Sequence, residues 1–174
     1  RVLAEDILAV EDIPGFARSR MDGYAYAVSC SDVVKARKNC PVVLRVIEKV
    51  PAGHLPQKAV RSGTAIKVMT GAPIPEGADA VIKFEDVALQ GEYVSIFTPV
   101  EAKKNIILAG EDVAKGNVVA KRGMVITPAH FNVMSVLGLD ILPVFVRPKA
   151  AVIATGDELV DMHRPVKPGE IRNS

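Results

Sequence analysis

Proline and glycine limit this chain to short regular elements. Twelve prolines and thirteen glycines are spread through 174 residues and leave only short stretches between them. Proline has no backbone N–H to donate, and glycine loses more conformational entropy than any other residue inside a helix or strand. Because 49% of the residues are hydrophobic, the chain still has enough apolar side chains for a packed core.

The stretches between these residues are rich in valine and isoleucine. Several of them alternate between apolar and polar side chains, which is typical of a half-buried sheet. β-branched side chains suit such a pleated surface. We therefore expect mostly antiparallel β structure over residues 40–126, with strands at 42–47, 65–70, 80–84, 93–97 and 118–120.

One helix is predicted near residues 128–138. Thr127 can cap it, Pro128 suits its first position and Gly138 suits its end. Phe131, Met134 and Leu137 recur at helical spacing, which predicts a core-facing side. Residues 141–146 are expected to form a strand in an edge or irregular position, because Pro143 interrupts them. Residues 2–10 fit a helix or a strand equally well.

The hydrophobic pattern changes from alternating to continuous near the C-terminal end of the sequence. The continuous apolar run 149–154 is typical of a strand that is buried on both faces of a parallel α/β sheet. Such a strand needs a crossover helix and a partner strand. Because the remaining residues are loop-like, we expect the sequence to be truncated just inside a further α/β domain.

Composition and motifs exclude several classes of function. The 22 basic and 20 acidic residues leave a net charge of +2 and form no basic stripe, so nucleic acid is not an expected partner. No apolar run approaches the ~20 residues that span a bilayer, which argues against membrane insertion. Cys30 and Cys40 are isolated and no export signal is visible, so we expect the cytoplasm. The P-loop, dinucleotide-binding and serine-nucleophile motifs are absent.

Four polar motifs lie beside glycines. They are Met21-Asp22-Gly23-Tyr24, Thr70-Gly71-Ala72-Pro73, Gly110-Glu111-Asp112 and Thr155-Gly156-Asp157-Glu158. Glycine allows a sharp turn and the close approach of a ligand. Carboxylates at such turns can hold Mg²⁺ together with substrate phosphate oxygens, and a threonine hydroxyl can donate to an oxyanion. Each motif alone is more typical of an ordinary turn or loop.

The strings and their order resemble the molybdopterin molybdenumtransferase family, which is called MoeA in bacteria and the E domain of gephyrin in animals. The most specific matches are Met-Asp-Gly-Tyr-Ala at 21–25 and Thr-Gly-Ala-Pro-Ile-Pro-Glu-Gly-Ala-Asp at 70–79. Further matches are residues 1–7, 14–16, 135–138 and 169–174, whereas Gly-Glu-Asp at 110–112 is not specific. The resemblance spans the whole chain in the family's order.

The resemblance implies an activity. The family inserts molybdenum from molybdate into adenylated molybdopterin and releases AMP. It works as an elongated homodimer and receives its substrate from a molybdopterin-adenylating protein or domain. Its site lies between the pterin-binding α/β domain of one subunit and the β-rich domain of the other. Cleavage of the adenylate calls for Mg²⁺, whose ligands the sequence leaves open.

By motif, the expected catalytic residues are Asp22, Thr70, Asp112 and Glu158, and the expected cofactor-binding residues are Gly71 and Asp157. Thr70 and backbone N–H groups near Gly71 are candidate donors to an oxyanion. Since most of the pterin-binding domain would lie beyond residue 174, we expect this chain alone to be inactive. A gephyrin-like scaffold is the alternative function.

The expected fold is predominantly β, in the α+β class. Irregular, coiled sheets form an elongated two-part body with one short helix, truncated at the start of an α/β domain. The expected domains are a β-rich domain at 9–116, a connector made of 1–8 and 117–148, and the opening strand and loop of the pterin-binding domain at 149–174.

Overall fold

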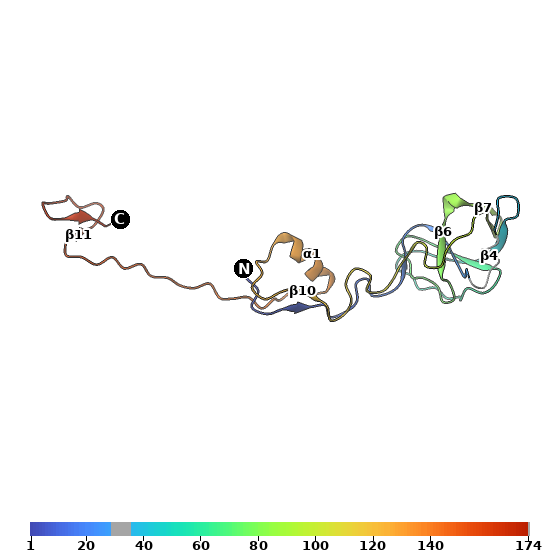
Figure 1. Ribbon diagram of the computed structural model, residues 1–174, viewed down its shortest axis with the longest axis horizontal. Helices are drawn as coiled ribbons and strands as arrows, with labels where there is room; N and C mark the ends of the chain where they lie inside the picture. The colour runs from blue at the N-terminus through green and yellow to red at the C-terminus, as the bar shows by residue number, and fades with distance from the viewer. Residues whose placement is uncertain (29–35, 174) are drawn as a thin grey trace.

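A six-stranded sheet forms the largest part of the molecule. The computed structural model describes residues 1–28 and 36–173, and Figure 1 shows an elongated shape with this sheet at one end. The strand order is β6-β3-β5-β4-β8-β7. The strands are β3 (Gly23–Tyr26), β4 (Val42–Val50), β5 (Thr64–Val68), β6 (Ala80–Lys83), β7 (Val87–Gln90) and β8 (Tyr93–Ile96).

The other elements are short. Three pairs of short strands and one helix complete the described chain. Antiparallel pairing joins β1 (Ile7–Leu8) to β10 (Val118–Ala120) and β2 (Arg18–Ser19) to β9 (Ile106–Ile107). The single helix α1 spans Pro128–Val136, a 3₁₀ turn spans Phe84–Asp86, and the parallel pair β11 (Leu159–Val160) and β12 (Ile171–Arg172) lies near the C-terminus.

The predominantly β fold is confirmed, and each predicted strand of the central region is present. One pairing departs from the antiparallel prediction, because β4 and β5 run parallel. The intervening segment 51–63 carries the chain back to the start of β4, where the Arg45 N–H donates to the Gly63 carbonyl at 2.9 Å. A parallel neighbour requires a return segment of this kind.

The sheet is covered on both faces. Along β3 the side chains alternate, so that Tyr24 and Tyr26 join one buried cluster while Ala25 and Ala27 join the other. Leu44, Val94 and Ile96 also belong to the first cluster, and Ile66, Val68 and Val81 belong to the second. The short alternating strands therefore form a closely packed body despite their length.

A second, smaller core lies at the N-terminus. Leu3, Ile7, Ala120 and Met134 are buried together there. The N-terminal residues adopt extended structure, and the Leu3 N–H donates to the Met124 carbonyl at 3.0 Å. Of the two conformations that fit residues 2–10, the strand is therefore the one that forms.

The predicted helix is present, but one of the three residues predicted to face the core is exposed. Thr127 precedes the helix, and its N–H donates to Nδ1 of His130 at 3.0 Å, which ties the first turn together. Met134 and Leu137 are buried, whereas Phe131 is 56% exposed. The connector core therefore covers the side of α1 that carries Met134 and leaves the side with Phe131 exposed.

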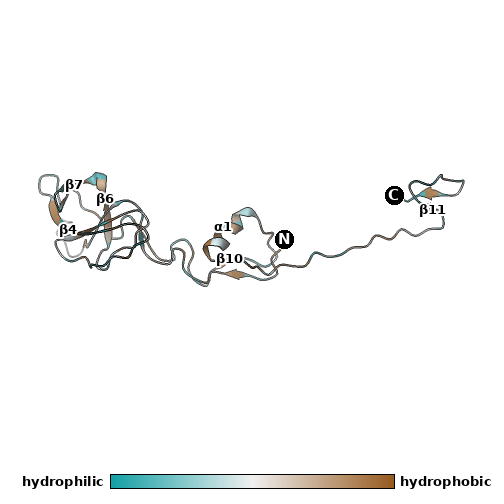
Figure 2. Ribbon diagram, turned by 180° about the vertical axis from the view of Figure 1, so that it is seen from behind, coloured by the Kyte–Doolittle hydropathy of each residue, from teal (hydrophilic) through white to brown (hydrophobic). Residues whose placement is uncertain are grey.

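Two predicted strands near the C-terminus do not form. Residues 141–146 contribute only the single bridge between Leu3 and Val144. Residues 149–154 are extended without a partner, and Val152 is 97% exposed (Figures 1 and 2). A strand needs a neighbouring strand to satisfy its backbone groups, and the described residues supply none here. The domain boundaries at 8, 116 and 148 stay predictions.

No helix among the described residues is long and apolar enough to cross a membrane. Cys40 is a free, exposed thiol, and Cys30 lies outside the described residues.

The buried and exposed sides of α1 allow a direct test of the packing in the connector core. Replacing Met134 with alanine should lower the free energy of unfolding of the connector by about 2–5 kcal/mol, because it leaves a cavity at a buried position. Phe131→Ala is the matched control and should change it by less than about 0.5 kcal/mol. Hydrogen exchange of the α1 amides measures both. Equal losses would contradict the packing described.

Candidate functional site

Asp22 and Thr70 lie close together at one end of the sheet, where β3 begins and the neighbouring strand β5 ends. Asp22 directly precedes β3 and Thr70 follows β5, and the antiparallel register pairs Gly23 with Val68. Both the backbone N–H and the hydroxyl of Thr70 donate to Oδ1 of Asp22, each at 2.7 Å. The sheet thus joins two predicted catalytic residues that are far apart in the sequence.

Two glycines make this geometry possible. A Cβ atom at position 23 would collide with the carbonyl oxygen of Ile82, so β6 can approach β3 only beside glycine. Gly71 has φ of +82°, in the left-handed region that side chains disfavour. Gly71 directly follows Thr70, whose N–H donates to the Asp22 carboxylate.

The two donors from Thr70 stabilise the ionised form of Asp22. The backbone N–H of Thr70 is the largest cause and its hydroxyl the second, and together they lower the pKa of the Asp22 carboxyl below its ordinary value. Desolvation opposes this effect, and the ammonium group of Lys67 adds a further lowering of the pKa. Asp22 is therefore an anionic hydrogen-bond acceptor at neutral pH.

The backbone donors around Gly71 are already occupied. The Thr70 N–H is bound to Asp22, the Gly71 N–H donates to the Ser19 carbonyl at 2.9 Å, and the Ala72 N–H donates to the Met69 carbonyl at 2.9 Å. The expected role of these groups as donors to an oxyanion is therefore not supported by the geometry. An anion at this end of the sheet would need side-chain donors instead.

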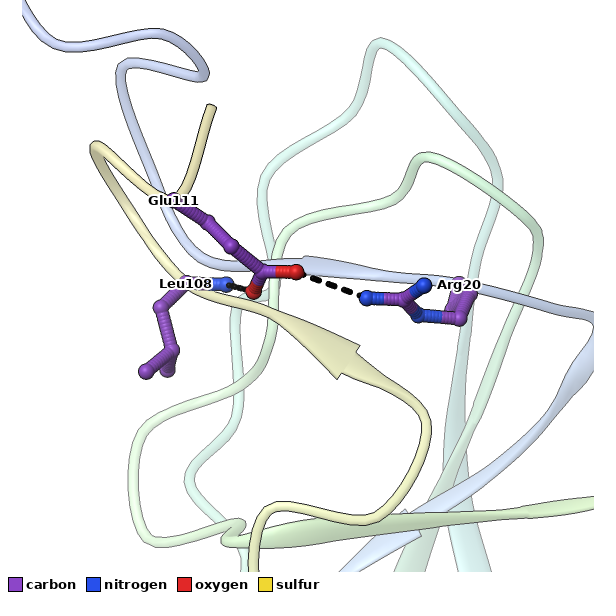
Figure 3. Close-up of polar contacts among 3 residues, drawn as sticks. All are labelled: Arg20, Leu108 and Glu111. Carbon is purple, nitrogen blue, oxygen red and sulfur yellow. Dashed lines mark hydrogen bonds and ion pairs between the residues drawn. The ribbon is translucent and has the colours of Figure 1, made fainter. Parts of the chain in front are cut away.

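An ion pair ties the loop that carries Asp112 to the segment that carries Asp22. Figure 3 shows Glu111 reaching across to Arg20, with 2.7 Å between Oε1 and the guanidinium nitrogen. The second oxygen of Glu111 accepts the Leu108 N–H at 2.9 Å. Because Arg20 lies two residues before Asp22, the ion pair links the two predicted sites.

Asp112 lies beside a groove rather than in contact with Asp22. Its backbone N–H donates to the Ile13 carbonyl at 3.0 Å. The groove has a volume of about 560 Å³ and is also lined by Asp12, Arg18 and Asn132 of α1. It therefore lies where the β-rich body adjoins the connector helix.

Asp157 and Glu158 lie at the opposite end of the molecule from the sheet (Figure 1). They precede β11 directly, and the Glu158 carbonyl accepts the Ile171 N–H at 2.7 Å. The Glu158 carboxylate folds back over Gly156. A single copy of this chain therefore does not bring these two residues to Asp22 and Thr70.

Among residues 1–28 and 36–173, no three histidine, cysteine or acidic side chains gather closely enough to hold a metal ion. Sequence reasoning missed Arg20 and Lys67 as neighbours of the site. Lys67 comes near Asp22 through the pairing of β3 with β5, in which Lys67 is the register partner of Tyr24.

The comparisons with known proteins agree with this architecture. Residues 1–138 match the family model described as the MoeA N-terminal region, domains I and II. The chain therefore belongs to the MoeA family.

Several relatives cover almost all of this chain. "Molybdopterin molybdenumtransferase" of Staphylococcus aureus is 40% identical over 99% of it, and that of Bacillus subtilis is 38% identical over all of it. The crystal structure of the molybdopterin biosynthesis moeA protein of Pyrococcus horikoshii OT3 superposes on the whole chain with a TM-score of 0.86 and 42% identity. The chain spans 41% of the length of each of these two curated relatives and 46% of that crystallised chain.

The two hydrogen bonds from Thr70 can be tested through the titration of Asp22. Thr70→Ala removes the hydroxyl donor but keeps the backbone donor, so the pKa of Asp22 should rise yet stay below its ordinary value. Because the folded pKa is lowered, the carboxylate stabilises the fold above the unfolded pKa, and this stabilisation is lost as pH falls through the folded pKa. NMR titration of the Asp22 carboxyl carbon measures the change.

Thr70→Ser keeps both donors and is the control. An Asp22 pKa that does not move in Thr70→Ala, or that moves equally in Thr70→Ser, would show that the hydroxyl does not stabilise the carboxylate.

Proposed function

We propose that this chain is the N-terminal part of an enzyme that inserts molybdenum from molybdate into adenylated molybdopterin and releases AMP. The observation that carries the proposal is the Asp22–Thr70 pair, built at the strand ends of a fold shared with relatives named molybdopterin molybdenumtransferase. The family-specific strings at 21–25 and 70–79 are the two segments that form this pair.

Asp22 supplies a fixed negative charge in the proposed reaction. Thr70 orients one carboxylate oxygen through two hydrogen bonds, which leaves the other oxygen to orient water or to bind a cation. Mg²⁺ commonly binds one or two carboxylates together with substrate phosphates, so Asp22 fits this kind of site without a three-residue cluster. When bound, Mg²⁺ would neutralise charge on the phosphates of the adenylate.

The second half of the proposed site comes from another subunit. Asp157 and Glu158 lie far along the chain from Asp22, so a site that uses all three residues calls for two copies (Figure 1). We propose a homodimer in which the segment with Glu158 of one subunit approaches the β-rich body of the other. A cytoplasmic molybdopterin-adenylating protein or domain would supply the substrate.

The test uses the full-length protein that contains this chain. Asp22→Asn and Glu158→Gln should each lower the rate of molybdenum insertion by about a hundredfold or more, because each removes a charge while keeping the size of the side chain. The rate is measured with purified adenylated molybdopterin and molybdate, by counting molybdenum in the product and AMP released.

Asp140→Asn is the control, since Asp140 is an exposed carboxylate outside the predicted site. It should leave the rate unchanged. Wild-type rates in Asp22→Asn and Glu158→Gln would refute the assigned residues, and a wild-type protein that releases no AMP would refute the reaction.

A further inference from the structure

Asn105 joins two segments that lie far from it in the sequence. Its side-chain Nδ2 donates to the Val81 carbonyl of β6 at 2.8 Å. Its own backbone carbonyl accepts the Arg20 N–H at 2.9 Å. Arg20 lies two residues before Asp22, so Asn105 connects the edge of the sheet to the segment that leads into the candidate site.

The side-chain bond of Asn105 completes the outer edge of β6. This strand is last in the order of the sheet, so β3 is its only partner there. Away from β3, the Val81 N–H donates to the Lys104 carbonyl at 3.0 Å, and the Val81 carbonyl accepts the Asn105 amide. Val81 is fully buried, and a buried carbonyl that loses its donor is costly. The bond between Asn105 and Val81 therefore stabilises the edge of the sheet.

Asparagine suits this position in two respects. The φ of Asn105 is +58°, in the left-handed region that asparagine adopts more readily than most side chains. The residue also supplies the amide donor for Val81. Glycine could adopt this conformation but has no side-chain donor, and an ionised aspartate could only accept. Asparagine combines both properties.

The segment before Asp22 is fixed at two consecutive residues. Ser19 exchanges two backbone hydrogen bonds with the turn at 71–72, each at 2.9 Å. Arg20, the next residue, is bound through its N–H to Asn105. The ion pair that the Arg20 side chain forms is exposed, and exposed pairs contribute little. Because Asn105 is half-buried, we expect its backbone bond to be the contact that fixes Arg20.

We propose that Asn105 is a positioning residue for the Asp22–Thr70 pair. By binding both β6 and Arg20, it fixes the segment that presents the Asp22 carboxylate to its two donors on Thr70. Its described hydrogen bonds go to Val81 and Arg20, so it acts on Asp22 through the intervening backbone. This effect on the pair does not depend on the reaction, whereas an effect on catalysis rests on the proposed function.

The first experiment removes the amide donor and follows the Thr70 N–H, which donates to Asp22. Asn105→Gly allows the left-handed conformation but has no side-chain donor. Hydrogen exchange of the Thr70 amide should accelerate about tenfold relative to the β8 amides, roughly the effect of losing one hydrogen bond. NMR titration should also show the pKa of Asp22 rise toward its ordinary value, because displaced donors stabilise the carboxylate less.

Two variants separate the lost donor from the flexibility that glycine adds. Asn105→Asp keeps the size of the side chain but has no donor when ionised, so it should accelerate Thr70 exchange at neutral pH by a similar factor. Lys103→Gly is the matched control, because Lys103 also has a left-handed backbone, with φ of +65°, and its replacement leaves the Asn105 amide in place. It should leave the Thr70 exchange rate and the Asp22 pKa unchanged.

The second experiment measures molybdenum insertion by the full-length protein that contains this chain. A displaced Asp22 should lower kcat rather than raise KM, because positioning acts on the reacting groups more than on binding. For Asn105→Gly we expect kcat to fall about tenfold, while KM for adenylated molybdopterin changes by less than about twofold. Lys103→Gly should keep the wild-type kcat.

Equal acceleration of exchange at Thr70 and in β8 would indicate general destabilisation and would contradict the positioning role. Unchanged exchange at Thr70, or an equal effect of Lys103→Gly, would contradict it as well. Failure of the proposed function has a different signature. In that case Asn105→Gly would still alter the Thr70 amide, while Asp22→Asn in the full-length protein would leave molybdenum insertion unchanged.

Discussion

The close pairing of β3 with its two neighbours is the constraint on which the candidate site depends. Gly23 allows β6 to approach on one side, and on the other side β5 places Val68 opposite Gly23. This register brings Thr70 to Asp22, and it aligns Lys67 with Tyr24 on the same face. A bulkier residue at position 23 would displace the backbone that holds the site together.

Local sequence pattern predicted the strands, the helix and the specific motifs, but it did not predict the long-range pairings. The alternation in 42–47 and 65–70 identified two strands and said nothing of their parallel register, which depends on the path of segment 51–63. Helical spacing grouped Phe131 with Met134, whereas the small connector core buries only Met134. For the same reason, motif comparison named Asp22 and Thr70 without revealing that the charge of Lys67 acts on Asp22.

The separation of the predicted residues along one chain also has a physical consequence. The sheet with Asp22 and the segment with Glu158 lie at opposite ends of an elongated molecule (Figure 1). Residues 149–154 expose large apolar side chains such as Val152 and Ile153 between them. The proposed site, shared by two subunits, would bring these residues together. The groove beside Asp112 lies at the junction between the sheet and the connector.

The most direct test of this account mixes two full-length variants, one with Asp22→Asn and one with Glu158→Gln, under conditions in which subunits exchange. In a mixed dimer, one of the two shared sites contains both wild-type residues. The account predicts that a statistical mixture regains about a quarter of the wild-type rate of molybdenum insertion, as two-fold symmetry requires. A mixture that is no more active than the separate variants would contradict a site shared between subunits.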